Sequence, residues 1–557
     1  MRITPPGLAG LFVVCVAVAI LTVAVPVGAV ERAVPTPNYP TIQSAIDACA
    51  DGDEVVIAPG RYRGDGNRDL DFAGRAITVR GTDPNDWTVV SATVIDCDGT
   101  EDDPHRGFYF HTGEDPNAVV AGLTITRGYA ARGGGIHCDG GVGPTITNCA
   151  IVRNACENWG GGIYLVDSSA VVINCLIRRN GVYTTTSFGG GGGICMFGDG
   201  ASTVSNCVVT DNFTVAYGPT AAAILCGCDR ATIANCTICS NRSENLLAGV
   251  VDCSSPNTVL TNCIVWDDPA ATPLGTIGDS PTVTYSNIQG GWPGEGNIDA
   301  DPCFSPLEGD YHLMPGSPCI DTGTNGPPGG LPATDIDGSP RPVDGDGDTT
   351  IVVDMGAYEK PGVGSFILAQ PNPVVFSTYD GGPTPDAASL GIANGGEGTL
   401  AWTVQEDAGW LDATPSSGES MGDVDEVTLT VDIETAGVGD HECLLRVLDP
   451  NATNHPRTIA VRLFVRQPRR VPSEYATIQA AIDEAEQYDT VLLAEGTHRG
   501  PGNRDVDFRG KSILVHGEGG PESCIIDCEG QGRGFYFHPA CPRSVDCSGM
   551  MHTDLSL

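Results

Sequence analysis

Residues 148–154 read NCAIVRN, and the chain repeats this phrase at nearly regular intervals. The later copies are NCLIRRN at 174–180, NCVVTDN at 206–212, NCTICSN at 235–241 and a decayed NCIVWDD at 262–268. The leading asparagines are 26, 32, 29 and 27 residues apart. A recurrence of this length indicates one structural unit that is stacked several times.

The apolar residues around each asparagine indicate which way the side chains point. The residue two before it is aliphatic, as in Ile146, and the residues one and three after it are a cysteine and a β-branched residue, as in Cys149 and Ile151. The period-2 alternation therefore slips by one residue at the asparagine. We expect a bend between two short strands there, with the asparagine side chains of successive coils hydrogen-bonded in an inward ladder.

Short strands, a bend and a coil of about 30 residues predict a parallel β-helix. The GGGI and NCxIxxN phrases resemble right-handed parallel β-helix proteins of the pectin-lyase-like superfamily, especially its secreted bacterial branch, and the repeats of chlamydial polymorphic outer-membrane proteins. We expect an all-β fold, with a right-handed parallel β-helix solenoid over residues 33–360. The resemblance is informative about the fold and says little about activity.

Both ends of the predicted solenoid need covering, because an open end exposes core and strand edges. Tyr39 to Cys49 has helical spacing with Thr41 as N-cap, and resembles the helix that plugs the first coil of pectin-lyase-like proteins. Residues 300–360 resemble the closing segment of such proteins, and we expect them to form the C-terminal cap.

Two further domains are expected after the solenoid. Residues 362–467 contain alternating segments between Gly, Pro and Asp turns, which predict a β-sandwich. The phrase TLAWTV at 399–404 and the phrase AGWLDATPSSGES at 408–420 resemble a BACON-type immunoglobulin-like module, a class associated with carbohydrate-active proteins. The start of the chain then returns, since 502–511 repeats 66–75 and RGFYFH at 533–538 repeats 106–111. We expect 470–557 to be a truncated second β-helix.

Composition and the N-terminus point to an exported protein. The formal charge is 29 − 70 = −41, which excludes nucleic acid as a natural partner. Residues 1–29 read as a secretory signal peptide cleaved after Ala29, with an uncleaved anchor as the alternative. We expect a secreted or cell-surface location and no membrane contact beyond this peptide.

Cysteine is abundant for an exported chain, with 22 residues. Five of them share one inward position of the repeat, where we expect small buried apolar filler; disulfides between neighbouring coils are the alternative. Cys303 and Cys319 bracket one short segment, and we predict a disulfide between them.

One edge of the solenoid is a candidate binding site. Arg127, Arg153 and Arg179 precede the second asparagine of their units or its equivalent, and the variable connections that follow carry the aromatic residues Trp159, Tyr183, Phe188 and Tyr217. Aromatic faces stack on sugar rings and guanidinium groups pair with uronate carboxylates, so this edge suits an acidic polysaccharide. The alternative is that the aromatics fold over the solenoid and the arginines are ordinary surface charge.

We therefore expect a protein that binds extracellular polysaccharide or another extracellular surface without turnover. The alternative is a polysaccharide lyase or glycoside hydrolase; in a lyase Arg153 or Arg179 is the candidate base, and no catalytic residue is assigned. Asp344, Asp346 and Asp348 alternate with glycines, as carboxylates do in calcium loops, and predict a Ca²⁺ site. A solvated acidic turn is the alternative there.

Overall fold

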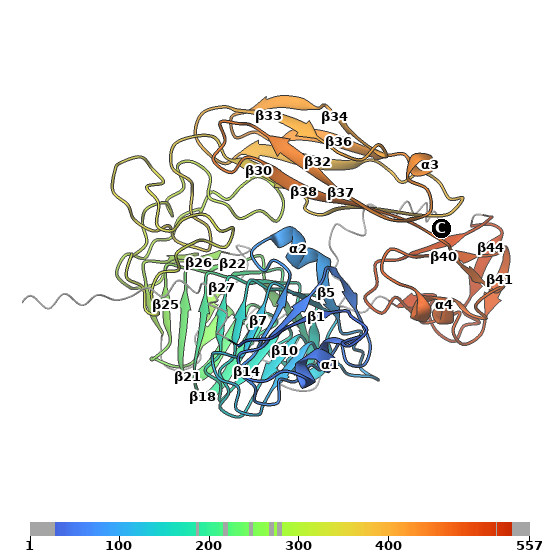
Figure 1. Ribbon diagram of the computed structural model, residues 1–557, viewed down its shortest axis with the longest axis horizontal. Helices are drawn as coiled ribbons and strands as arrows, with labels where there is room; N and C mark the ends of the chain where they lie inside the picture. The colour runs from blue at the N-terminus through green and yellow to red at the C-terminus, as the bar shows by residue number, and fades with distance from the viewer. Residues whose placement is uncertain are drawn as a thin grey trace, which may run out of the picture.

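The computed structural model describes residues 28–184, 189–215, 221–243, 249–266, 272–275, 281–519 and 521–536. The predicted signal peptide lies outside this range except for its last two residues. Figure 1 shows a parallel β-helix with an antiparallel β-sandwich above it, and a third, small β-unit stands beside both. In the described part of the chain, no helix is long and apolar enough to cross a membrane.

Three parallel sheets run along the β-helix. Sheet A has two limbs, which are joined by the long strands β18 (Ile194–Ser205) and β21 (Ile224–Ala234). Its first limb also contains β6 (Phe108–Phe110), β10 (Ile136–Cys138), β14 (Ile163–Val166), β24 (Gly249–Cys253) and β27 (Thr272–Gly275). Its second limb also contains β1 (Glu31–Val34), β2 (Glu54–Ile57), β4 (Thr78–Gly81), β7 (Val119–Ala121), β11 (Thr145–Thr147), β15 (Val171–Ile173), β25 (Val259–Thr261) and β28 (Thr282–Thr284).

The other two sheets complete each coil. Sheet B contains β3 (Gly60–Tyr62), β5 (Thr93–Asp96), β8 (Thr124–Thr126), β12 (Ala150–Val152), β16 (Leu176–Arg178), β19 (Val208–Thr210), β22 (Thr237–Cys239), β26 (Ile264–Trp266) and β29 (Asn287–Ile288). Sheet C contains β9 (Tyr129–Arg132), β13 (Ala155–Trp159), β17 (Gly181–Tyr183), β20 (Phe213–Val215) and β23 (Arg242–Ser243). The predicted inward positions are confirmed, since Ile146, Cys149 and Ile151 are fully buried.

The asparagine that opens each repeat stands at the predicted bend, with φ of +52° at Asn148 and +54° at Asn174. Asn174 Nδ2 donates to Asn148 Oδ1 at 3.2 Å, and Asn206 Nδ2 donates to Asn174 Oδ1 at 2.6 Å, so the ladder is confirmed there. Asn206 Oδ1 accepts instead from Arg341 Nη1 at 2.6 Å, and the next link is missing.

A second ladder runs through the asparagines that close the repeats. Asn180 Oδ1 accepts from the backbone N and the Nδ2 of Asn154, both at 3.0 Å, and Asn212 Oδ1 does the same for Asn180. These side chains are almost completely buried, and each amide is satisfied by the neighbouring coils. The residue before them takes a left-handed conformation, with φ of +57° at both Arg153 and Arg179.

The N-terminal helix is α1 (Ile42–Asp47), whose N-cap Thr41 accepts from Ser44 N, as predicted. A second helix, α2 (Trp87–Ala92), lies on the flank of the solenoid. Residues 300–360 were expected to cap the far end, but much of this segment runs back over the outer face of sheet B. Trp87 Nε1 donates to Ile336 O at 3.1 Å, and Ala357 N donates to Thr237 Oγ1 at 2.9 Å.

The β-sandwich consists of two packed sheets. One contains β30 (Ile367–Gln370), β32 (Ala388–Asn394), β36 (Asp425–Val431) and β34 (Leu411–Thr414). The other contains β31 (Val374–Tyr379), β38 (Arg457–Arg466), β37 (Gly439–Leu448), β33 (Leu400–Gln405) and β35 (Ser417–Ser420). A short helix, α3 (Ile433–Ala436), follows β36.

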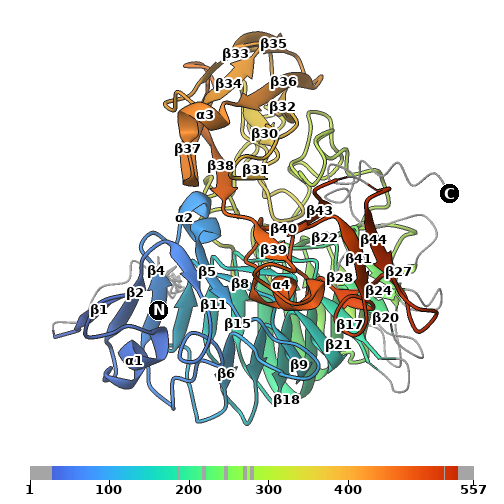
Figure 2. The same ribbon diagram turned by 90° about the vertical axis from the view of Figure 1, so that its right-hand side faces the viewer.

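The third unit repeats the start of the β-helix, and Figure 2 shows it in front of the solenoid. Its helix α4 (Ile478–Glu484) has Thr477 as N-cap. Its parallel strand sets are β39 (Arg469–Val471), β40 (Thr490–Leu493) and β43 (Leu514–Gly517); β41 (Gly496–Arg499) and β44 (Cys524–Asp527); and β42 (Val506–Asp507) and β45 (Phe535–Tyr536). We call residues 469–536 the second segment.

Candidate functional site

The outer face of the first limb of sheet A carries a row of rings, because the second residue of β6, β10 and β14 points away from the core. Tyr109 on β6, His137 on β10 and Tyr164 on β14 are partners in register. The ring centroids of Tyr109 and His137 are 4.9 Å apart, and those of His137 and Tyr164 are 5.0 Å apart. His111 stacks on Tyr109 at 4.2 Å and extends the row.

Two arginines lie over this row. The guanidinium carbon of Arg106 is 5.0 Å from the ring centre of Tyr109, and that of Arg132 is 5.9 Å from the ring centre of Tyr164. Arg106 Nη1 also lies 2.7 Å from His137 Nδ1. Cation–π contact and hydrogen bonding therefore fix the arginines beside aromatic faces.

Two carboxylates come from the chain segment before β6. Asp69 takes a left-handed conformation with φ of +51°, and its Oδ1 accepts from Arg106 N at 3.0 Å. Its Oδ2 lies 2.5 Å from His105 Nδ1. Asp71 Oδ2 lies 3.4 Å from His111 Nε2.

These groups surround a cleft of about 590 Å³. Its lining is formed by Asp69, Asp71, Arg106, Tyr109, His111, Ala131, Arg132, His137 and Asn158. The cleft combines an aromatic face, fixed positive charge and carboxylates, and a pocket with a few convergent polar groups is a candidate ligand site.

Protonation within the cleft is set by burial and by the arginines. Burial, and then the charges of Arg106 and Arg132, lower the pKa of His137 to about 3, so its imidazole is neutral at pH 7. Because Arg106 donates to Nδ1, the ring proton is on Nε2. That nitrogen is buried and has no hydrogen-bond partner in the described part of the chain. His137 is therefore a neutral ring in the cleft wall, whose Nε2–H is enclosed by the protein.

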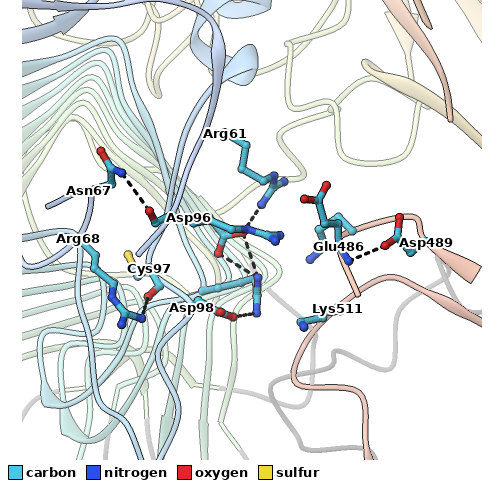
Figure 3. A network of polar contacts seen from close by, with 12 residues as sticks. Arg61, Asn67, Arg68, Asp96, Cys97, Asp98, Glu486, Asp489 and Lys511 are labelled. Carbon is cyan, nitrogen blue, oxygen red and sulfur yellow. Dashed lines mark hydrogen bonds and ion pairs between the residues drawn. The ribbon is translucent and has the colours of Figure 1, made fainter. Parts of the chain in front are cut away.

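The sequence-predicted arginines are not in this cleft. Arg127 is 7% exposed and its Nη1 lies 3.0 Å from Asp96 Oδ2, so it belongs to a buried ion cluster and its expected place in a ligand-binding edge is wrong. Figure 3 shows this cluster with Asp96, Asp98 and Arg61. Arg153 and Arg179 stand at the bend between sheets B and C, and Arg179 Nε is 3.7 Å from Asp211 Oδ2.

The predicted aromatics are divided between two places. Trp159 ends β13, across sheet C from Arg153, and packs edge-on against Phe197 at 5.0 Å in the cluster that includes Tyr164. Tyr183 packs against Phe213 at 4.9 Å. Phe188 and Tyr217 lie outside the described residues. The predicted single edge of arginines and aromatics is therefore split by sheet C.

The predicted calcium ligands are only partly brought together. Asp344 and Asp346 lie with Asp321, and one carboxylate oxygen of each is within 4.8 Å of the others. Asp348 turns elsewhere, since its Oδ1 accepts from Thr350 N at 2.6 Å. Burial, with a contribution from the Asp346 and Asp344 charges, raises the pKa of Asp321.

The predicted Cys303–Cys319 disulfide is not formed, and both residues are free thiols. Their sulfurs have different partners: Cys319 Sγ accepts from Asn287 Nδ2 at 3.1 Å, and Cys303 Sγ donates to Asp301 O at 3.5 Å.

The sequence contained a signal for the cleft that the arginine pattern obscured. RGFYFH, which supplies Arg106, Tyr109 and His111, is one of the phrases that recur near the end of the chain. The middle residues of three successive strands, Tyr109, His137 and Tyr164, are also all aromatic. Reading that strand position down the repeats would have found the row.

Comparison with known families agrees with the structure. A model described as a right handed beta helix region matches residues 85–238 and, in an overlapping placement, 117–272. A model described as a viral BACON domain matches residues 372–442. No curated protein matches the chain. The chain is thus similar to right-handed β-helix proteins and carries a BACON-like module, a combination consistent with a carbohydrate-related extracellular protein.

Proposed function

We propose that this is a secreted or cell-surface protein that binds an acidic polysaccharide in the cleft beside β6 and β10. The observation that carries the proposal is that Arg106, held over the ring of Tyr109, and a second arginine, Arg132, line one cleft. An aromatic face stacks on a sugar ring, and a guanidinium group beside it pairs with a carboxylate or sulfate on that sugar.

The charge of the whole chain makes this recognition short-ranged. A protein of net charge −41 repels a polyanion at long distance, so attraction must come from contacts inside the cleft. Salt at about 0.15 M shortens the Debye length to roughly 8 Å and reduces the long-range repulsion more than the direct contacts. Binding should therefore tolerate physiological salt.

Turnover by a hydrolase or lyase is the alternative, and Asp69 and Asp71 in the same cleft favour it. Glycoside hydrolysis commonly uses two carboxyl groups that flank the scissile bond. Two facts support binding instead. Asp69 is held by His105 and by the backbone of Arg106. His137, with a pKa of about 3, is a weak base near neutral pH.

Affinity electrophoresis tests the proposal with polygalacturonate, alginate and chondroitin sulfate, and with hydroxyethyl cellulose as the neutral control. We expect retardation by an acidic polymer and at least about tenfold weaker binding by the double variant Tyr109→Ala/Arg132→Ala, because each charge-assisted contact contributes about 1.5–3 kcal/mol. Arg230→Ala is the matched control, an exposed arginine on β21 away from the cleft. No retardation, or equal retardation of all three proteins, contradicts the proposal; new reducing ends or unsaturated uronide absorbance would establish the enzyme instead.

We also propose that Asp321, Asp344 and Asp346 hold Ca²⁺. Asp321 Oδ1 is buried and has no hydrogen-bond partner within the described ranges, which leaves one carboxylate oxygen for a hard cation. The ion would offset the repulsion between three neighbouring carboxylates. Calorimetric titration with Ca²⁺ should show one site that Asp321→Asn removes, and an unchanged titration in that variant would refute the assignment.

A further inference from the structure

The second segment carries its own copy of the first half of the cleft. Residues 69–111 supply Asp69, Asp71, Arg106, Tyr109 and His111 to the cleft lining. The matching residues of the second segment are Asp505, Asp507, Arg533, Tyr536 and His538. His538 lies outside the described residues, and the other four can be compared directly.

The arrangement of these side chains is the same in the two places. The guanidinium carbon of Arg533 is 4.9 Å from the ring centre of Tyr536, against 5.0 Å for Arg106 and Tyr109. Arg533 N donates to Asp505 Oδ1 at 3.1 Å, as Arg106 N donates to the carboxylate of Asp69 at 3.0 Å. Asp505 has a φ of +50°, close to the +51° of Asp69. The resemblance therefore extends from sequence to the three-dimensional placement of an arginine, a ring and a carboxylate.

The strength of the ion pair between Arg533 and Asp505 does not account for this agreement. The side chains of Arg533 and Asp505 are 66% and 52% exposed, and an ion pair with that exposure contributes little to stability. Other positions of the repeat differ freely, since Arg61 corresponds to Thr497 and Arg75 to Lys511. The contact of the exposed Arg533 with Tyr536 thus recurs beside an aspartate that also accepts a hydrogen bond from the backbone of this arginine.

The carboxylate of the second segment differs from that of the first cleft in one neighbour. His105 lies against Asp69 in the solenoid, at 2.5 Å, whereas Gly532 occupies the matching position. A Cβ at Gly532 would lie 2.2 Å from Asp505 Oδ2, so a side chain there would displace this carboxylate oxygen. The carboxylate of Asp505 is consequently not covered by an imidazole.

We propose that Asp505, Asp507, Arg533 and Tyr536 form a second binding site for the same class of acidic polysaccharide, so that one chain holds one polymer at two points. The inference rests on the function proposed for the first cleft. The second segment is docked on the β-sandwich, because Arg466 Nη1 of β38 lies 2.9 Å from Asp489 and 3.2 Å from Glu486. Phe464 of β38 also stacks on Tyr488 at 4.8 Å. Two sites fixed on one body bind a long polymer more tightly than either site does alone.

Calorimetry on the full chain tests the inference, with polygalacturonate and its tetramer and with alginate and its tetramer run in parallel. Arg533→Ala/Tyr536→Ala is compared with Arg106→Ala/Tyr109→Ala, and Arg499→Ala, 62% exposed in the same segment, is the matched control. We expect the tetramer to bind the unmodified chain at two sites and each double variant at one. Affinity for the polymer should fall about tenfold to a hundredfold in either double variant.

The outcomes separate the two proposals. A single tetramer site that only Arg106→Ala/Tyr109→Ala removes overturns the second site and leaves the first. A chain that binds none of the four probes overturns both. Loss of one site in each double variant, with the control unchanged, establishes two sites. Exchange protection of α4 in the Arg533→Ala/Tyr536→Ala variant verifies that the second segment is still folded.

Discussion

Residues 31–111 and the second segment build the same start of a β-helix with the same contacts. Gln43 Nε2 donates to Asp71 O at 3.0 Å, and Gln479 Nε2 donates to Asp507 O at 3.0 Å. The first strand of each is also fixed alike, by ion pairs of 2.6 Å between Arg32 of β1 and Asp53 in one and of 2.9 Å between Arg469 of β39 and Asp489 in the other.

The two regions differ in what covers their charges. Asp96 on β5 is fully buried, and Arg61, Arg63 and Arg127 reach it within 3.0 Å. The matching Asp527 on β44 is 36% exposed and pairs with Arg499 alone, at 2.9 Å. Arg127 belongs to the coil above Asp96. The same sequence, Ile-Asp-Cys, occurs in both places. Its aspartate forms an interior ion cluster where a further coil covers it, and an exposed ion pair where the described chain has no further coil over it.

The largest expected effect comes from removing the two aspartates in turn. Asp96→Asn leaves three arginines crowded in the interior and should lower the free energy of unfolding of the solenoid by about 3–5 kcal/mol. Asp527→Asn breaks an exposed pair and should cost less than about 1 kcal/mol. Hydrogen exchange of peptides from β5 and β44 measures both, because a chain of several domains need not unfold in one step.

The same variants test how the interior of the solenoid tolerates the charge of Asp96. Burial alone raises the pKa of Asp96, but Arg127, Arg61 and Arg63 more than compensate and hold its pKa below the ordinary value. If Asp96→Asn proves as mild as Asp527→Asn, water reaches the cluster and the contrast between the two regions disappears.

Much of the solenoid could be predicted because the same pattern of asparagine and apolar residues recurs in successive coils. One slip of the alternation at Asn148 fixed the inward residues, and a helical pattern after Thr41 located α1. The course of residues 301–360 could not be read in this way, since it depends on single contacts such as Trp87 with Ile336, 249 residues apart. A contact between residues so far apart leaves no periodic pattern in the sequence.

The candidate site was harder to predict for a related reason. Arginines at one position of the repeat looked alike in sequence, yet Arg127 is buried against Asp96 whereas Arg179 stays near the surface. Burial depends on which acid the neighbouring coil supplies. Arg106 and Arg132, which reach the cleft, occupy different places in their coils, and only the packing of β6 beside β10 brings them together.

A middle-sized effect should distinguish the segment 331–360 from the second segment by the pH dependence of stability. Burial, followed by the charge of Asp337, raises the pKa of Asp335 to about 6, and burial raises the pKa of Glu359 to about 7. Folded carboxyls that hold their protons more tightly contribute stability that is complete below their ordinary pKa values and lost as pH rises through about 6 and 7. Exchange protection of 331–360 should therefore fall by about 1–3 kcal/mol between pH 4 and pH 8.

The stability of the second segment should depend on pH in the opposite sense and at higher pH values. Burial and the charge of Arg127 lower the pKa of Lys511 from 10.5 to about 8, and Figure 3 shows this lysine beside Asp98 and the ion cluster. Its contribution is present above pH 10.5 and lost as pH falls through about 8. Protection of α4 should rise by about 1–2 kcal/mol from pH 7 to pH 10. Glu359→Gln should flatten the pH dependence of protection in 331–360 only, and Lys511→Met should flatten that of α4 only. If protection changed with pH in the same direction in both segments, the roles given to these two groups would be wrong.

The smallest effect should come from making the two regions more alike. Arg61→Thr places in the solenoid the residue that the second segment has at position 497, and removes one of three cations around Asp96. The side chain of Arg61 is 33% exposed, and Arg63 Nε remains 2.7 Å from Asp96, so we expect a loss below about 1 kcal/mol. The reverse change, Thr497→Arg, adds a cation near an exposed Asp527 and should gain less than about 0.5 kcal/mol.

Combined with Asp96→Asn, Arg61→Thr should become stabilising, because it then relieves repulsion between unpaired arginines. A cycle of these variants in the exchange assay measures that change of sign. If Arg61→Thr instead costs as much as Asp96→Asn, the cluster acts as one unit in which every cation is needed, and the exposed pair of the second segment is no guide to it.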